Sequence, residues 1–185
     1  FIWDAKPQNT IIVQLGDQLD GGGRGTGESH GELEIINFME DMHNQAFLKG
    51  GGVYSLIGNH EVMNLLGDFR YASKKDIKEQ GGEELRRQLF KPGGDLFNRL
   101  SCTRNVILQI GSFLFTHAGI VPNNLKDVTD PKKFINKINY LMRQFLQGKK
   151  DKNDTEIQKY FLEKDTSIIW NRHYGNDNPN CNEVE

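Results

Sequence analysis

Residues 56–71 read Leu-Ile-Gly-Asn-His-Glu-Val-Met-Asn-Leu-Leu-Gly-Asp-Phe-Arg-Tyr, and this stretch decides the fold prediction. The apolar residues 53–57 lead into it and end at Gly58, a pattern that predicts a buried strand closed by a turn. A helical pattern begins near Glu61. Asn59 and His60 therefore follow directly on a strand end, which is where α/β proteins place ligand-binding side chains.

The segment upstream predicts a second buried strand that ends in the same way. Residues 10–15 form a short β-branched run closed by Gly16, and two acidic residues, Asp17 and Asp20, follow. A helix is predicted next, because apolar residues recur at helical spacing at Leu33, Ile36, Met39, Met42 and Ala46. Residues 10–58 thus predict a βαβ unit with parallel strands and a right-handed crossover.

The segment downstream predicts a hairpin and two further helices. Residues 105–110 and 112–116 are apolar runs separated by Gly111, which is typical of antiparallel strands, and His117 follows the second run. Helical spacing recurs at 83–90 and at 131–145, and the charged residues 149–154 predict a surface loop.

The polar groups after these three predicted strand ends suggest a metal site. Each alone has an ordinary explanation, since an Asp after Gly is often a turn residue and a lone His is often packed. Together, Asp17, Asn59 and His117 offer a carboxylate that can bridge two cations, an amide oxygen and an imidazole nitrogen, which suit Mn²⁺, Fe or Zn²⁺. His60 would then be able to move protons, with Asp20 accepting a hydrogen bond from one of its ring nitrogens.

Composition limits the function classes. The 185 residues contain 23 Lys and Arg against 25 Asp and Glu, a net charge of −2, which disfavours nucleic acid as an electrostatic partner. No apolar run approaches the roughly 20 residues that a membrane span needs. The two cysteines, Cys102 and Cys181, cannot build a disulfide framework, so we expect an intracellular, cytoplasmic protein of one domain over residues 1–185.

The three polar groups also resemble a known family. In chain order, 16–20, 58–61 and 117–119 resemble the second, third and fourth motifs of the phosphoprotein-phosphatase group of calcineurin-like metallophosphoesterases. Residues 56–71 are most similar to the Shewanella-like branch, and 170–174 resemble its Trp-x-Arg segment. The resemblance extends from about residue 11 to residue 174.

The resemblance implies a fold and a set of roles. The fold would be an α/β (α+β sandwich) metallophosphoesterase domain, with mixed β-sheets flanked by helices. Asp17 would bridge two divalent metal ions (Mn, Fe or Zn), and Asn59 and His117 would hold the second ion. His60 would be the general acid with Asp20 behind it.

Three departures from the family pattern stand out. The first family motif, an Asp-x-His, does not occur before Asp17, and a late His ligand is expected beyond a further strand, so we expect a partial domain truncated at both ends. In the family an Arg directly follows the second Asp, whereas Gly21 follows Asp20 here. Arg24 and Arg172 are the candidates for binding the phosphate instead.

The sequence thus predicts an enzyme, a metal-dependent phosphomonoester hydrolase acting on phosphorylated protein. A metal-bridging hydroxide would attack phosphorus, and His60 would protonate the departing oxygen. Two alternatives stay open. One is a hydrolase of dinucleoside polyphosphates or other small phosphate esters, since fold does not determine substrate. The other is a non-catalytic phosphate-binding module.

Overall fold

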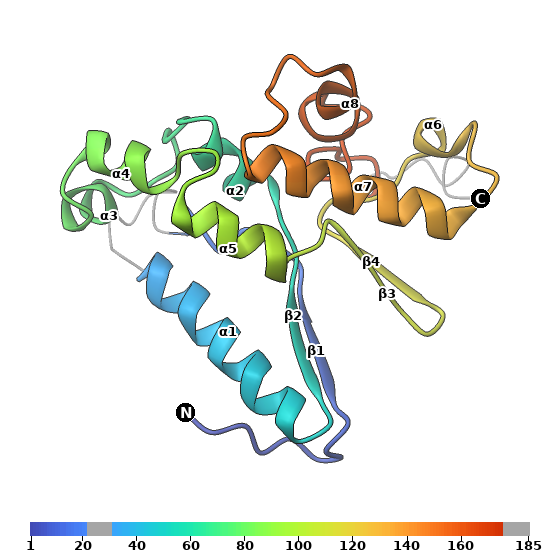
Figure 1. The fold of residues 1–185 in the computed structure, drawn as a ribbon, viewed down its shortest axis with the longest axis horizontal. Coiled ribbons are helices and arrows are strands. Elements are labelled where there is room, and N and C mark those ends of the chain that lie inside the picture. The colour runs from blue at the N-terminus through green and yellow to red at the C-terminus, as the bar shows by residue number, and fades with distance from the viewer. Residues whose placement is uncertain (22–30, 176–185) are drawn as a thin grey trace.

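The computed structural model describes residues 1–21 and 31–175. Figure 1 shows a long helix and a pair of strands that extend away from a larger group of helices. The strands are β1 (Ile11–Gln14), β2 (Gly52–Ser55), β3 (Ile107–Ile110) and β4 (Phe113–Thr116). The helices are α1 (Glu32–Leu48), α2 (Asn59–Leu65), α3 (Lys74–Glu79), α4 (Glu83–Leu89), α5 (Asp95–Thr103), α6 (Pro122–Leu125), α7 (Pro131–Leu146) and α8 (Thr155–Ile157), with a π-helical turn at Gln158–Leu162.

The βαβ unit predicted from the sequence is present. β1 and β2 pair in parallel with Ile12 opposite Val53, and α1 packs along them (Figure 1). The inward side of α1 includes Ile36 and Ala46, both fully buried, as the helical spacing predicted. Because the strands are parallel, the residues that follow them lie at one edge of the sheet.

The predicted hairpin is also present and is joined to this unit. β3 and β4 are antiparallel, and Gly111 between them has a φ of 59°, which glycine adopts without strain. The Ile57 N–H donates to the Asn105 carbonyl at 2.9 Å, just before β3, within a short parallel bridge. This link brings the start of the hairpin to the end of β2.

The main hydrophobic core lies among the helices beyond the strand ends. α7 packs across α5 (Figure 1), and it begins at Pro131 after Asp130, whose side chain accepts a hydrogen bond from the Lys133 N–H at 3.1 Å. The largest fully buried apolar side chains of this core include Phe90, Phe97, Phe145 and Phe161. The core therefore supports the strand ends from one side.

Several short helices were not predicted. α3, α5, α6 and α8 have between three and nine residues, which is too few turns for an apolar period to stand out. α5 nevertheless buries Leu96, Phe97 and Leu100 in the core. The predicted charged loop at 149–154 is confirmed, since the structure contains neither helix nor strand there.

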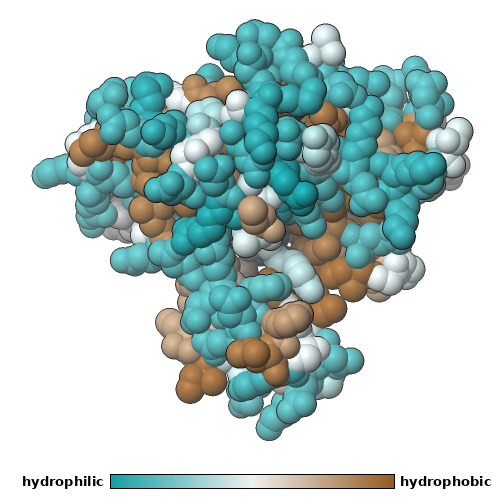
Figure 2. Space-filling model, viewed as in Figure 1, coloured by the Kyte–Doolittle hydropathy of each residue, from teal (hydrophilic) through white to brown (hydrophobic). Residues whose placement is uncertain are grey.

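Part of the strand surface is apolar. Phe113 and Leu114 of β4 are 68% and 50% exposed, and Figure 2 shows brown, apolar surface in the region of this hairpin. Ile11 and Ile12 of β1 are also exposed, so the prediction of a buried strand was wrong here: among the described residues β1 is an edge strand that pairs only with β2. None of the helices in the described part of the chain has the length and apolar character to cross a bilayer.

Candidate active site

Two glycines let the loops after β1 and β2 touch. Gly16 has a φ of 102°, and a Cβ there would lie 2.6 Å from the Gly58 nitrogen. A Cβ on Gly58 would lie 2.3 Å from Oδ1 of Asp17. Asp17 itself has a φ of 56°, a left-handed conformation that costs energy for any residue with a side chain. The close approach therefore fixes where the Asp17 carboxylate lies.

Glu61 forms hydrogen bonds with both loops. Its buried carboxylate accepts backbone hydrogen bonds from Asp17 at 2.9 Å, Gln18 at 2.7 Å and Gly58 at 2.7 Å. Burial and the negative charge of Asp17 raise the pKa of Glu61, against the opposing effect of these N–H groups and of Arg104. Glu61 thus holds the loops after β1 and β2 together.

The three predicted metal ligands lie together. Nε2 of His117 lies 3.2 Å from Oδ2 of Asp17 and 3.0 Å from Oδ1 of Asn59. Asp17 follows β1, Asn59 is the first residue of α2, and His117 follows β4. The structure therefore brings three donor atoms from three strand ends to one point.

The hydrogen bonds of His117 show what this point attracts. Nδ1 lies 2.8 Å from the Leu15 carbonyl, which can only accept, so Nδ1 carries a proton. The other ring nitrogen faces two oxygen acceptors, and a proton or a cation must sit among them. Burial lowers the pKa of His117, but the hydrogen bond and charge of Asp17 outweigh it and hold this pKa above its usual value. Burial has the opposite effect on Asp17 and raises its pKa. The hydrogen bonds and positive charges of His117 and His60 outweigh burial and hold the pKa of Asp17 below its usual value.

The donor set fits a divalent metal ion. Donor atoms about 2.1 Å from one ion lie about 3 Å apart when they occupy neighbouring positions around it. A backbone carbonyl that accepts from Nδ1 is also the usual partner of a metal-ligating histidine. Within residues 1–21 and 31–175, no group of three His, Cys, Asp or Glu side chains could hold a metal ion. The cluster at Asp17 and His117 has only two such side chains, because its third donor is the amide of Asn59.

His60 and Asp20 lie beside this cluster. Nδ1 of His60 lies 2.9 Å from Oδ2 of Asp20, the contact that the sequence predicted, and both residues are buried. Nε2 of His60 lies 3.9 Å from Oδ2 of Asp17. A cavity of about 230 Å³ is lined by Asp17, Leu19, Asp20, Gly21 and His60, so the histidine ring borders an opening at the cluster.

Two further charged residues, missed by the sequence analysis, lie behind this pair. Arg86 of α4 forms an ion pair with Asp20 at 3.0 Å, and Glu32 of α1 pairs with Arg86 at 2.7 Å. Arg86 is fully buried although charged side chains rarely are. The only sequence signal is that Arg86 precedes the buried Phe90 by four residues and so shares its helix face.

The two predicted phosphate-binding arginines are not part of the described cluster. Arg24 lies outside the described residues. Arg172 is exposed, and its segment packs near the loop after β4, where Asn171 donates to the Gly119 carbonyl at 2.8 Å. No hydrogen bond or ion pair joins Arg172 to Asp17, Asn59 or His117 in the described part of the chain.

Comparison with known proteins identifies the family. A family model described as Calcineurin-like phosphoesterase matches residues 2–180. The chain belongs to this family. An uncharacterised protein of Acanthamoeba polyphaga mimivirus is 38% identical over 155 residues, which are 75% of this chain and 61% of that protein. Shewanella-like protein phosphatase 2 of Arabidopsis thaliana is 44% identical over 71 residues, which are 38% of this chain and 16% of that protein. The resemblance inferred from the motifs is thereby confirmed.

A solved structure has the same fold. The structure of a cold-active protein tyrosine phosphatase superposes with a TM-score of 0.73 at 23% sequence identity, covering 95% of this chain and 49% of that one. The predicted fold class is therefore confirmed as a calcineurin-like metallophosphoesterase fold, and its described part has a small parallel sheet and a small antiparallel sheet flanked by helices. This chain spans 61% of the mimivirus relative and about half of the solved structure.

Proposed function

We propose that this protein is a metal-dependent phosphomonoester hydrolase that acts on phosphorylated protein. The observation that supports this most directly is the meeting of Asp17, Asn59 and His117 at one point, with the His60–Asp20 pair beside it. Donors for a cation and a buried histidine–carboxylate pair are the two components that a metal-assisted hydrolysis needs.

Asp17, Asn59 and His117 would hold the metal. Divalent ions there would supply Lewis-acid charge stabilisation and a nucleophile at neutral pH. Asn59 is a suitable partner for a phosphate substrate, because its neutral amide adds no negative charge that would repel an arriving phosphate. His117 is turned toward the same point by its hydrogen bond to the Leu15 carbonyl.

His60 would act as the general acid. The Asp20 carboxylate accepts from Nδ1 at 2.9 Å, which orients the ring and leaves Nε2 on the side of Asp17. A proton on Nε2 would pass to the leaving oxygen of the substrate as its bond to phosphorus breaks. General acids of this kind contribute about 10² to 10⁴ in rate, most where the leaving oxygen is strongly basic.

Two observations favour a phosphoprotein substrate. The side chains of Asp17 and His117 are 28% and 18% exposed, so the cluster opens to the surface, where a protein-bound phosphate could reach it. The Arabidopsis relative is named a protein phosphatase. Fold alone does not determine substrate, so the experiment has to compare substrate classes.

The test is phosphate release by the purified full-length protein with added Mn²⁺. The substrates are phosphoserine, phosphothreonine and phosphotyrosine peptides and diadenosine tetraphosphate. We expect hydrolysis of at least one peptide, no hydrolysis without metal, and its loss in Asp17→Asn but not in Asp127→Asn, an exposed control. Hydrolysis of diadenosine tetraphosphate alone would contradict the substrate class. Binding of phosphopeptide without any release of phosphate would show a binding module instead.

A further inference from the structure

We propose that Arg86 is a positioning residue for the general acid, acting through Asp20 on His60. This inference rests on the proposed function, because it assigns Arg86 a part in the same reaction. Arg86 forms no hydrogen bond or ion pair with Asp17, Asn59 or His117 in the described part of the chain, and it reaches the His60 ring through the Asp20 carboxylate.

Arg86 is held from every side of its guanidinium group. Nη2 donates to Oδ1 of Asp20 at 3.0 Å, and Nη1 donates to Oε2 of Glu32 and to Oε1 of Gln80, both at 2.7 Å. Nε and Nη2 donate to Oδ1 of Asn64 at 3.0 Å and 2.7 Å. All three nitrogens are therefore engaged, and the planar group has one orientation.

Aromatic rings complete the enclosure. The guanidinium carbon lies 4.7 Å from the centre of the Phe90 ring and 5.3 Å from that of Phe69. Both rings exclude water from the ion pairs, and their faces attract the cation. Arg86 is consequently a rigid group at the base of the site.

Asp20 connects the fixed guanidinium group of Arg86 to the ring of His60. One oxygen of Asp20 pairs with Arg86, while the other accepts from His60 at 2.9 Å and from Asn64 at 3.0 Å. Its backbone N–H donates to Glu32 at 2.7 Å, which holds the residue in its left-handed conformation with a φ of 62°. Because both oxygens are engaged, the carboxylate cannot rotate, and the His60 ring keeps one orientation.

A role in stability alone does not account for this arrangement. Buried ion pairs are often no more stabilising than well-packed apolar residues of similar volume, because their charges must leave water. The side chains of Asp20, Glu32 and Arg86 are at most 1% exposed, so the full free-energy cost of removing these charges from water applies. The network also ends at a ring beside the metal ligands and not at another part of the core.

The first test compares two substrates in two variants. Arg86→Lys keeps the charge but offers three donors in place of the five of the planar fork, so it cannot keep every hydrogen bond that Arg86 makes to Asp20, Glu32, Gln80 and Asn64. We expect kcat on a phosphoserine peptide to fall about 10- to 100-fold, as for other residues that orient a catalytic group, with KM unchanged. On nitrophenyl phosphate, whose leaving group needs no proton, the loss should be less than about threefold.

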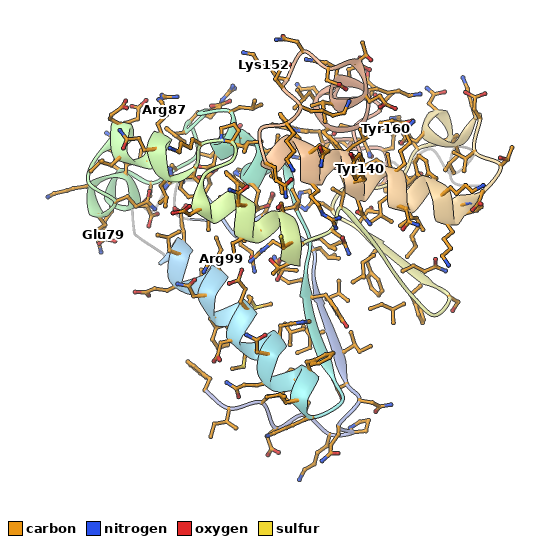
Figure 3. All side chains as sticks on the ribbon, in the orientation of Figure 1. Glu79, Arg87, Arg99, Tyr140, Lys152 and Tyr160 are labelled. Carbon is orange, nitrogen blue, oxygen red and sulfur yellow. The ribbon has the colours of Figure 1, made fainter. Side chains whose placement is uncertain are left out.

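Arg87→Met is the matched control. Arg87 is the next residue of α4, lies on the outside of the molecule in Figure 3, and is paired with Glu83 at 3.1 Å. This variant should leave kcat on both substrates unchanged.

In a protein that already contains His60→Asn, Arg86→Lys should cause no further loss of kcat, because residues that act as a unit are not additive. Equal losses on both substrates, or full additivity with His60→Asn, would overturn the proposal.

A second readout does not depend on turnover. In ¹⁵N-labelled, Zn²⁺-loaded protein, imidazole NMR should show Nδ1 of His60 protonated, and Arg86→Met should leave Nδ1 only partly protonated. An unchanged Nδ1 signal in folded Arg86→Met would overturn the proposal. If Arg86→Met does not fold, the same spectrum of Arg86→Lys decides. If the unaltered protein hydrolyses no substrate, the proposed function fails, and the NMR result alone judges the positioning role.

Discussion

The side-chain oxygen of Asn59 lies 3.0 Å from Nε2 of His117, although 58 positions separate the two residues in the chain. One residue begins α2 after the second strand, and the other follows the hairpin. The bridge from Ile57 to Asn105 and the antiparallel pairing of β3 with β4 bring them together. Oδ2 of Asp17 lies 3.2 Å from the same nitrogen. Two acceptor oxygens and a ring nitrogen can lie this close only when a proton or a cation sits among them.

Removal of the Asn59 amide should weaken metal binding. In Asn59→Ala we expect Mn²⁺ affinity to fall about 10-fold or more, because one of three clustered donors is lost. Isothermal titration calorimetry measures the Mn²⁺ affinity, and Asn123→Ala, at an exposed position on α6, is the control. The ligand assignment would be wrong if both variants bound Mn²⁺ as tightly as the unaltered protein.

A methyl group at Gly58 should displace Asp17. The added Cβ of Gly58→Ala would lie 2.3 Å from Oδ1 of Asp17, closer than any real contact, while the φ of −103° suits alanine. We expect a loss of about 1–3 kcal/mol in the free energy of unfolding, together with impaired Mn²⁺ binding. Urea unfolding and calorimetry measure the two effects. Gly175→Ala, where none of the described residues lies within 4 Å of the added Cβ, is the control and should change neither.

Glu61 should be needed as a carboxylate. Glu61→Gln places an NH₂ group against backbone N–H groups that now donate to Oε1 or Oε2, so at least one of these donors loses its acceptor. A buried unsatisfied group costs about 1–3 kcal/mol, and urea unfolding should show a loss of that size. Glu84→Gln on the exposed side of α4 should cost far less. Equal stability of the two variants would count against Glu61 as the support of the loops.

His60 should matter most for poor leaving groups. His60→Asn is expected to lower turnover of a phosphoserine peptide about 10² to 10⁴-fold and that of nitrophenyl phosphate much less. Steady-state assays of both substrates at one Mn²⁺ concentration give the ratio. A similar loss on both would assign His60 to metal binding or to structure, since either role affects all substrates alike.

Much of the scaffold could be predicted from local patterns. The strands β1 and β2 come from short apolar runs and the helices α1 and α7 from apolar residues at helical spacing, and the structure contains each of these elements. The meeting of Asp17 and Asn59 followed from a general property of parallel strands, namely that their carboxyl ends share one edge. His117 joins them because β4 runs antiparallel to β3, and the start of β3 lies at the end of β2.

The support behind the site could not be predicted. Arg86 and Glu32 are charged residues on amphipathic helices, where local patterns place such side chains toward solvent. Their burial depends on contacts between α1, α4 and the residues after β1, which are 54 and 66 positions apart in sequence. A charged residue on an apolar helix face, such as Arg86 four residues before Phe90, is the one local signal of such a network.

The central claim is that Asp17, Asn59 and His117 bind one divalent metal ion. The most direct measurement is an anomalous difference map from a crystal of the protein soaked in Mn²⁺, collected at the manganese absorption edge. We predict a peak about 2.0–2.3 Å from Oδ2 of Asp17, Oδ1 of Asn59 and Nε2 of His117. A map with no peak at these atoms, at Mn²⁺ concentrations that support turnover, would contradict the claim.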